Sequence, residues 1–151
     1  MEFVVIYAMT FIGTPYHWGG NGTEQFPGYD CSGFIQQVLG AFGAVPKFDQ
    51  NADSLYRYFK KHQKSKFILK KGSLLFFGKK TQISHVAMAI DTKNMLEAGG
   101  GGKNFTKKNA SVRIRPIKSR SDLIAYILPY VHPKNIRESI ILKKTTGENP
   151  L

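Results

Sequence analysis

The sequence has only one cysteine in 151 residues. One thiol cannot form a disulfide within the chain, and it cannot supply the several thiolates of a structural zinc site. The apolar stretch at residues 3–13, "FVVIYAMTFIG", is too short to cross a membrane as a helix. We therefore expect no internal disulfide, no transmembrane segment, no bound metal and no other cofactor.

Acidic residues are also scarce, with 10 Asp and Glu against 22 Lys and Arg, which gives a net charge of +12. Such an excess favours polyanionic partners through long-range attraction. A lysine-rich solvated surface explains the composition equally well, and both interpretations stay open. The lysines are spread along the chain in pairs, at 60–61, 70–71, 79–80, 107–108 and 143–144.

The length suits one domain, and a hydrophobic content of 42% is enough to build its core. Helical spacing of apolar residues predicts helices over 2–13, 31–42 and 52–61, with a turn-rich loop over 14–30. Short β-like segments follow at 73–77, 85–90, 95–98, 111–117 and 123–128. Helices followed by strands indicate an α+β fold with an antiparallel sheet. We expect the domain to span residues 1–131 and a C-terminal extension to span 132–151.

Two segments invite other interpretations. The run Gly99–Asn104 fails as a phosphate-binding loop, because Asn104 follows the lysine and Glu97 stands where the first glycine is needed. We expect a loop that borders a groove.

The segment "LYRYFKKHQKSK" mixes aromatic and basic residues as nucleic-acid-binding surfaces do. However, Leu55, Tyr56 and Phe59 fit a core-facing helical stripe at least as well, so nucleic acid is not an expected partner.

Cys31 stands where the turn-rich loop gives way to a helix. Backbone N–H groups without helical partners and the helix dipole both favour a thiolate at the first turn of a helix. The same N–H groups can stabilise the oxyanion that forms when a thiolate attacks an acyl carbon. The polar neighbours Asp30 and Ser32 are poor context for a buried structural cysteine. Cys31 is therefore a candidate nucleophile.

A cysteine nucleophile needs a base within hydrogen-bonding distance. His85 is the best placed of four histidines, because it opens the most apolar predicted strand. Its alternate neighbours Ala87 and Ala89 are small, so we expect that face to leave room for the end of a helix. Glu97 shares the face of His85 if the turn between their strands holds an odd number of residues, three or five. It could then orient the imidazole, and the alternative is an exposed glutamate.

Four motifs, "GTPYHWGG", "YDCSGF", "GSLLFF" and "ISHVAMAI", follow one another as in the NlpC family of papain-like cysteine peptidases. The resemblance covers roughly residues 3–128, and it implies a papain-like α+β fold with N-terminal helices packed on a central antiparallel sheet. It also implies cleavage of peptidoglycan stem peptides, typically between D-glutamate and the diamino acid. We expect a monomer that acts on these peptides, with anionic cell-wall polymer as a possible partner.

The resemblance also implies roles for individual residues. Cys31 would be the nucleophile and His85 the base. Tyr16, Asp30 and Ser32 match positions that recognise the free amine of the stem peptide's L-alanine, and Ser84 would line the same groove. Asp30 could instead simply cap the helix.

The chain departs from the family pattern in two ways. The third catalytic position, twelve residues after the base, commonly holds a second histidine, and here it holds Glu97. No secretory signal is visible near Met1, so we expect an enzyme that acts at the bacterial cell wall after phage delivery, after release by another route, or as a mature fragment.

Two other functions stay open. One is a papain-like amidase or acyltransferase that uses the same Cys31–His85 pair. The other is a non-catalytic basic module that binds cell-wall polymer or nucleic acid.

Overall fold

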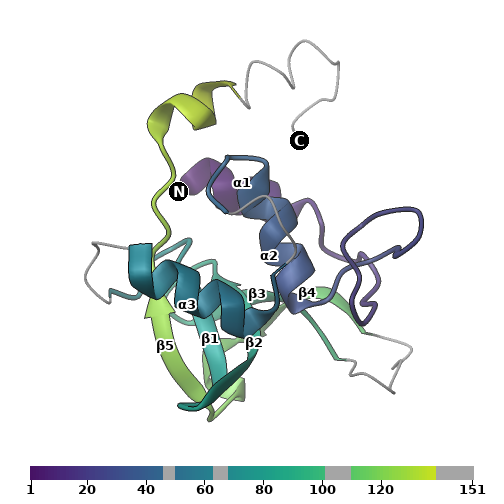
Figure 1. Cartoon of the computed structure of the whole chain (residues 1–151), viewed down its shortest axis with the longest axis vertical. Helices are drawn as coiled ribbons and strands as arrows, with labels where there is room; N and C mark the ends of the chain where they lie inside the picture. Colours follow the sequence, from purple (N-terminus) through teal and green to yellow (C-terminus); the bar gives the residue numbers. More distant parts are fainter. Residues whose placement is uncertain (46–49, 63–67, 101–109, 139–151) are drawn as a thin grey trace.

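The computed structural model describes residues 1–45, 50–62, 68–100 and 110–138. Its helices are α1 (Glu2–Met9), α2 (Cys31–Gly40), α3 (Ala52–His62) and the short 3₁₀ helix η1 (Ile117–Ser119). Its strands are β1 (Leu74–Lys79), β2 (Gln82–Ala89), β3 (Asn94–Gly99), β4 (Ser111–Pro116) and β5 (Leu123–Ile127). They form one antiparallel sheet in the order β4-β3-β2-β1-β5 (Figure 1). The predicted α+β class is confirmed.

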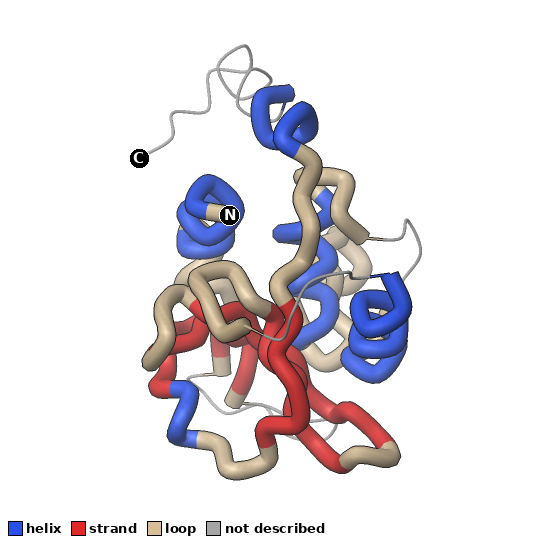
Figure 2. The backbone as a smooth tube through the Cα atoms, turned by 90° about the vertical axis from the view of Figure 1, so that its left-hand side faces the viewer, coloured by secondary structure: helices blue, strands red, loops and turns tan. Residues whose placement is uncertain are grey.

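The larger core lies between the helices and one face of the sheet. Figure 2 shows the helices above and beside the strands. This core combines Val4, Phe34, Leu39, Leu55 and Phe59 from the helices with Leu74, Phe76, Val86, Met88 and Leu96 from the strands. Because Leu55 and Phe59 are fully buried there, the core interpretation of the α3 stripe is confirmed. The rest of that aromatic and basic segment, residues 63–66, lies outside the described residues.

The opposite face of the sheet carries a smaller core of Leu75, Phe77, Ala87, Ala89, Met95 and Ile117. Ala87 and Ala89 thus pack away from α2, and the expectation that they make room for its end was wrong. The turn between β2 and β3 contains residues 91–93, because Ile90 N–H donates to the Asn94 carbonyl. That odd count confirms that Glu97 belongs to the face of His85, while Leu96 turns to the larger core.

Several boundaries differ from the prediction. Helix α1 ends at Met9, because the chain then turns and Gly13 N–H donates to the Val112 carbonyl of β4. Helix α2 ends at Gly40, two residues early. Strand β2 begins at Gln82, so His85 lies inside the strand and does not open it. The pairing register of β1 with β2 shifts between Phe77 and Gly78, which leaves Ser84 of β2 unpaired in a bulge.

The chain after β5 returns to the helical side. Residues 133–138 are helical, and the Asn135 side chain donates to the Phe42 carbonyl at 2.8 Å. Val131 is buried and Ile136 packs against the larger core. The division into a domain of 1–131 and an extension of 132–151 stays a prediction. Among the described helices, none is long and apolar enough to span a membrane.

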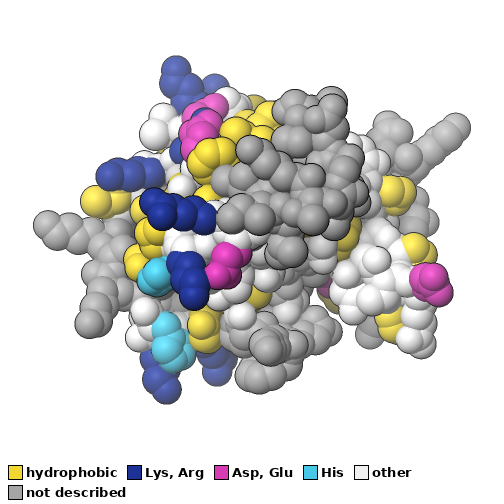
Figure 3. All heavy atoms as spheres, turned by 90° about the horizontal axis from the view of Figure 1, so that it is seen from above, with side chains coloured by type: hydrophobic (Ala, Val, Ile, Leu, Met, Phe, Trp, Pro, Cys, Tyr) yellow, Lys and Arg dark blue, Asp and Glu magenta, His cyan; other side chains and the backbone are white. Residues whose placement is uncertain are grey.

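Basic side chains are distributed over the surface. Figure 3 shows Lys and Arg in several separate places on one face of the molecule, next to hydrophobic side chains. The described lysine pairs are all exposed: Lys60, Lys61, Lys70, Lys71, Lys79 and Lys80. The pairs at 107–108 and 143–144 lie outside the described residues. The described lysines therefore add positive charge without building a single basic arm.

Gly33 allows the loop before α2 to lie directly on the helix. A Cβ at this position would collide with the Gly20 carbonyl oxygen, which already accepts a hydrogen bond from Asp30 N–H at 3.0 Å. We expect Gly33→Ala to lower the free energy of unfolding by about 2 kcal/mol, because the loop must move off the helix. A Cβ at Gly40, in the same helix, would meet Val45 at an ordinary 3.7 Å. Gly40→Ala is therefore the control, and urea unfolding should show equal or slightly higher stability. Equal losses in both variants would contradict this explanation.

Candidate active site

Cys31 is the first residue of α2 and is half-buried. Asp30 precedes it as the helix N-cap, with extended backbone and a carboxylate that accepts from Gly33 N–H at 2.7 Å. The cap fixes where the helix begins, and it leaves the Cys31 thiol beside the unpaired end of the helix. The predicted placement of Cys31 at a helix N-terminus is confirmed.

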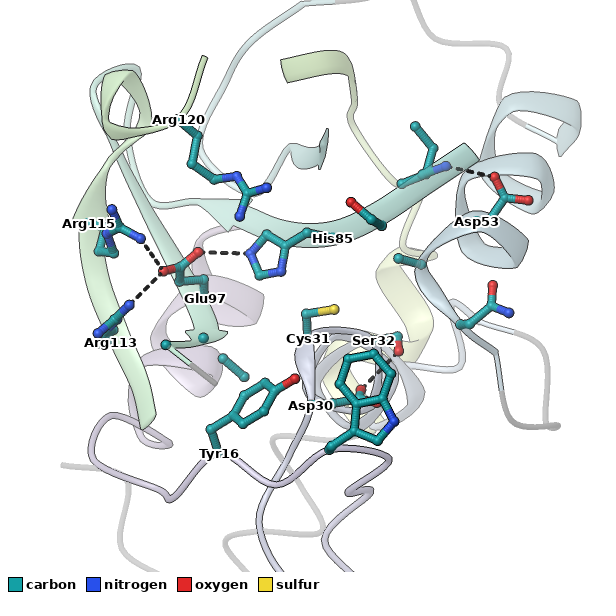
Figure 4. Close-up of a pocket in the computed structure, with 18 of the residues that line it drawn as sticks. Tyr16, Asp30, Cys31, Ser32, Asp53, His85, Glu97, Arg113, Arg115 and Arg120 are labelled. Carbon is teal, nitrogen blue, oxygen red and sulfur yellow. Dashed lines mark hydrogen bonds and ion pairs between the residues drawn. The ribbon is translucent and has the colours of Figure 1, made fainter. Parts of the chain in front are cut away.

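His85 bridges Cys31 and Glu97. Its Nε2 lies 2.8 Å from Glu97 Oε2, and the Cys31 thiol lies next to its ring (Figure 4). Because Nε2 is hydrogen-bonded to Glu97, Nδ1 is the ring nitrogen that remains available to Cys31. Figure 4 shows the sulfur directly below the ring and Glu97 on its other side. The geometric expectation that Glu97 faces His85 is confirmed, and its role in catalysis stays a prediction.

His85 and Glu97 favour the charged form of each other. Burial by itself lowers the pKa of His85, but hydrogen bonds and charge from Cys31 and Glu97 outweigh it and raise that pKa to about 9. Burial likewise raises the pKa of Glu97, while the hydrogen bonds and positive charge of His85 and Arg115 lower it to about 2. Glu97 is only 1% exposed, so its negative charge acts on His85 with little screening by water. At neutral pH the site therefore holds an imidazolium beside a carboxylate.

Two arginines complete the surroundings of Glu97, and the sequence interpretation missed both. Arg115 donates to Glu97 Oε1 at 3.1 Å and Arg113 at 3.4 Å. They come from β4, where Arg113 pairs directly opposite Glu97. Their alternation in "SVRIRP" places them on one face of a strand. However, only the pairing of β3 with β4 shows which face that is and what it meets.

The residues predicted to recognise an amine lie together at the start of α2. Ser32 Oγ donates to Asp30 Oδ1 at 2.9 Å, and Gly19 N–H donates to Asp30 Oδ2 at 3.2 Å. Burial, and then the negative charges of Cys31 and Asp30, raise the pKa of Tyr16 to about 12, so its hydroxyl keeps its proton. The cap interpretation of Asp30 is thus correct. A carboxylate has acceptor capacity beyond these bonds, and recognition of an amine stays a prediction.

A groove of about 830 Å³ joins these groups. Tyr16 and Asp30 line one part of it, and Arg113, Arg115 and Arg120 line another, with Cys31 and His85 between them (Figure 4). Ser84 is exposed and lines the groove near His85. Gly99 and Gly100 border it as expected, while residues 101–104 lie outside the described residues. Trp18, which is 55% exposed, is a groove residue that the sequence interpretation did not single out.

The arrangement suits acyl transfer through a thiolate. The described residues contain no group of three or more His, Cys, Asp or Glu side chains that could hold a metal ion. They do contain a thiol next to a histidine, and a buried carboxylate hydrogen-bonded to that histidine (Figure 4). Such an arrangement activates a thiol for attack on a carbonyl carbon.

Comparison with known families gives one match over most of the chain. The sequence model described as the NlpC/P60 family matches residues 13–119. Peptidoglycan endopeptidase RipA of Mycolicibacterium smegmatis is 29% identical in an alignment of length 142 that covers 87% of this chain and 25% of that protein. The probable peptidoglycan endopeptidase LytE of Bacillus subtilis is 33% identical over 105 residues, which are 69% of this chain and 29% of that protein. The chain thus spans between a quarter and a third of the length of these two relatives.

Solved structures show the same fold. The P60 domain of an antigen from M. avium subspecies paratuberculosis superposes with a TM-score of 0.63 at 23% identity. The aligned part covers 87% of this chain and 94% of that one. The NlpC/p60 domain of the peptidoglycan hydrolase SagA gives a TM-score of 0.60 at 25% identity, over 82% of this chain and 94% of that one.

Proposed function

The chain belongs to the NlpC/P60 family, and from this membership and the site geometry we propose that it is a cysteine endopeptidase of peptidoglycan. Its substrates would be stem peptides, cut between D-glutamate and the diamino acid, at the bacterial cell wall. The observation that carries the proposal is the juxtaposition of Cys31, His85 and Glu97 in one groove, with His85 beside the thiol and hydrogen-bonded to Glu97 (Figure 4). The curated relatives RipA and LytE are named peptidoglycan endopeptidases, which supports the substrate class.

In the proposed reaction, Cys31 Sγ attacks the scissile carbonyl carbon and the carbonyl oxygen becomes an oxyanion. The N–H groups in the first turn of α2 and the protonated Tyr16 hydroxyl are positioned to stabilise that oxyanion. His85 then gives its Nδ1 proton to the leaving amine, and the C–N bond breaks to leave a thioester. A water molecule, deprotonated by His85, attacks the thioester and releases Cys31. Glu97 holds the imidazole in place throughout.

Digestion of purified peptidoglycan, with the products identified by mass, tests this function. We expect fragments that end at D-glutamate and fragments that begin with the diamino acid. Addition of a soluble amine separates hydrolysis from acyl transfer, because an acyltransferase would form an amide of D-glutamate. Intact stem peptides after digestion would reject the proposed activity.

Asp30 is proposed to bind the free amine of the stem peptide, together with Tyr16 and Ser32. We expect acetylation of that amine to lower kcat/KM by about tenfold, because a charge-assisted contact with the carboxylate is lost. Asp30→Asn separates the two functions of the residue, because asparagine is also a good helix cap. This variant should keep its melting temperature and lose the preference for the free amine. Equal cleavage of free and acetylated peptides by the wild type would rule out the amine site.

The positive surface is proposed to concentrate the enzyme on anionic cell-wall polymer. Interactions between surface charges are screened over about 8 Å at physiological salt. We therefore expect added salt to slow cleavage of intact cell walls several-fold while cleavage of short soluble peptides changes little. If both substrates respond alike, the lysines contribute only to solubility.

A further inference from the structure

The wall of the groove beside Glu97 carries more positive than negative charge. Glu97 has one negative charge and contacts three cations, namely protonated His85, Arg113 and Arg115. One carboxylate cannot balance three cations, so positive charge remains without an equivalent anion in this cluster. Arg120 does not add to the excess, because Asp122 pairs with it at 2.7 Å. The excess charge therefore belongs to Arg113 and Arg115.

Arg113 is the less satisfied of the two. Its contact with Glu97 is the longer, at 3.4 Å against 3.1 Å for Arg115. Its Nε–H is buried and has no hydrogen-bond partner within the described part of the chain. The guanidinium lies against the backbone of Gly100, where an added Cβ would come within 3.0 Å of it, and both residues line the groove. A guanidinium with spare donors is suited to bind a carboxylate through two parallel hydrogen bonds.

The position of Arg113 indicates which part of a substrate it would meet. The leaving amine must lie near His85, which protonates it. Figure 4 shows Arg113 and Arg115 beyond His85 and Glu97, and Asp30 at the other side of Cys31. A peptide whose amino end lies at Asp30 would therefore extend its leaving residue toward the arginines.

We propose that Arg113, supported by Arg115, binds a free carboxylate on the leaving residue of the substrate. The enzyme would then prefer stem peptides whose diamino acid carries a carboxylate to those in which it is a carboxamide. This specificity rests on the proposed function, because cleavage defines the leaving residue. It adds a second charged contact, opposite in sign to the one at Asp30, and together they would fix the direction of the peptide in the groove.

Binding to the inactive Cys31→Ala variant tests the proposal without turnover. The probes are the tripeptide L-Ala–γ-D-Glu–L-Lys with a free C-terminal carboxylate and the same peptide as its C-terminal amide. We expect calorimetry to give a Kd at least about tenfold lower for the acid. Arg113→Gln in the same background should reduce this ratio to about twofold or less. Lys118→Gln removes an equal charge from an exposed residue outside the groove, and it should leave the ratio unchanged.

The ratio of the two Kd values separates recognition of the carboxylate from general damage to the site, because a distorted site would weaken the binding of both peptides. Arg113→Lys serves as a second variant if Arg113→Gln unfolds, and it should retain only part of the preference, because lysine cannot bind a carboxylate through a planar fork. Equal Kd values for acid and amide, or a preference that survives loss of Arg113, would overturn the proposal.

Hydrolysis by the wild type tests the proposed function separately. A binding preference without hydrolysis of either tripeptide would reject the peptidase activity and keep the carboxylate site. Equal binding and equal hydrolysis of acid and amide would keep the activity and reject the site.

Discussion

Replacing Cys31 with alanine will lower kcat for stem-peptide cleavage by more than about 10⁴-fold, to the background rate. The groove would keep its shape, but no thiol would remain to form the thioester, because Cys31 is the only cysteine in the sequence. The measurement is release of the diamino-acid fragment, followed by mass. The side chain is small and half-buried, so the melting temperature should change little.

Alkylation of the wild type gives an independent check on the same residue. Because protonated His85 lies beside Cys31 at the start of α2 (Figure 4), iodoacetamide should label Cys31 faster than a free thiol at mildly acidic pH. His85→Asn should remove this acceleration and keep the fold. Cleavage by Cys31→Ala at the wild-type rate would show that the nucleophile lies elsewhere.

Replacing Glu97 with glutamine is expected to have the second largest effect, a fall in kcat of roughly 100-fold. Glutamine can still accept a hydrogen bond from His85, but it carries no negative charge. The imidazolium form of His85 would therefore be less stable. If Glu97→Gln kept full activity, the site would be a dyad of Cys31 and His85.

The pH profile shows whether Glu97 acts through His85. In the wild type the imidazolium is present below the His85 pKa of about 9, so activity should fall as the pH rises through that value. Loss of the carboxylate lowers the pKa of His85, and the alkaline limb of kcat/KM should move to lower pH in Glu97→Gln. A limb that stays near pH 9 would mean that Glu97 does not hold the imidazolium.

Arg115→Gln is the matched control for Glu97→Gln. It removes a neighbour of Glu97 at 3.1 Å and leaves the bond between Glu97 and His85 intact. Because it removes a positive charge near His85, the alkaline limb should stay or move to higher pH, opposite to its shift in Glu97→Gln. Both variants break a buried ion pair and should lose stability by a few kcal/mol. A loss of stability that both variants share therefore cannot explain alkaline limbs that respond differently in the two variants.

Glu97 also links stability to acid pH. Its pKa is about 2 in the folded chain and 4.5 without the fold. The ionised carboxylate therefore stabilises the fold above about pH 4.5, and this contribution is lost as the pH falls through about 2. In Glu97→Gln this part of the acid dependence should be absent from urea unfolding curves.

The sequence by itself determined the local parts of the site. The Gly-rich loop, the capping Asp30 and the apolar stripe after Cys31 placed the cysteine at a helix start, because caps and stripes act over a few residues. Alternation along β2 and β3, with a short turn between them, placed Glu97 on the face of His85 for the same reason. The class of fold also followed from the order of helical and β-like segments.

Only the tertiary structure decided which distant segments meet. The approach of α2 to β2 brings Cys31 to His85 across 54 positions of sequence. The pairing of β3 with β4 brings Arg113 and Arg115 to Glu97, and the loop 14–30 brings Tyr16 and Trp18 to the groove. Strand order and register depend on the packing of whole sheet faces, and no short window of residues specifies them. The charge balance around Glu97, and with it the proposed carboxylate site, therefore depends on the strand order and register of the folded sheet.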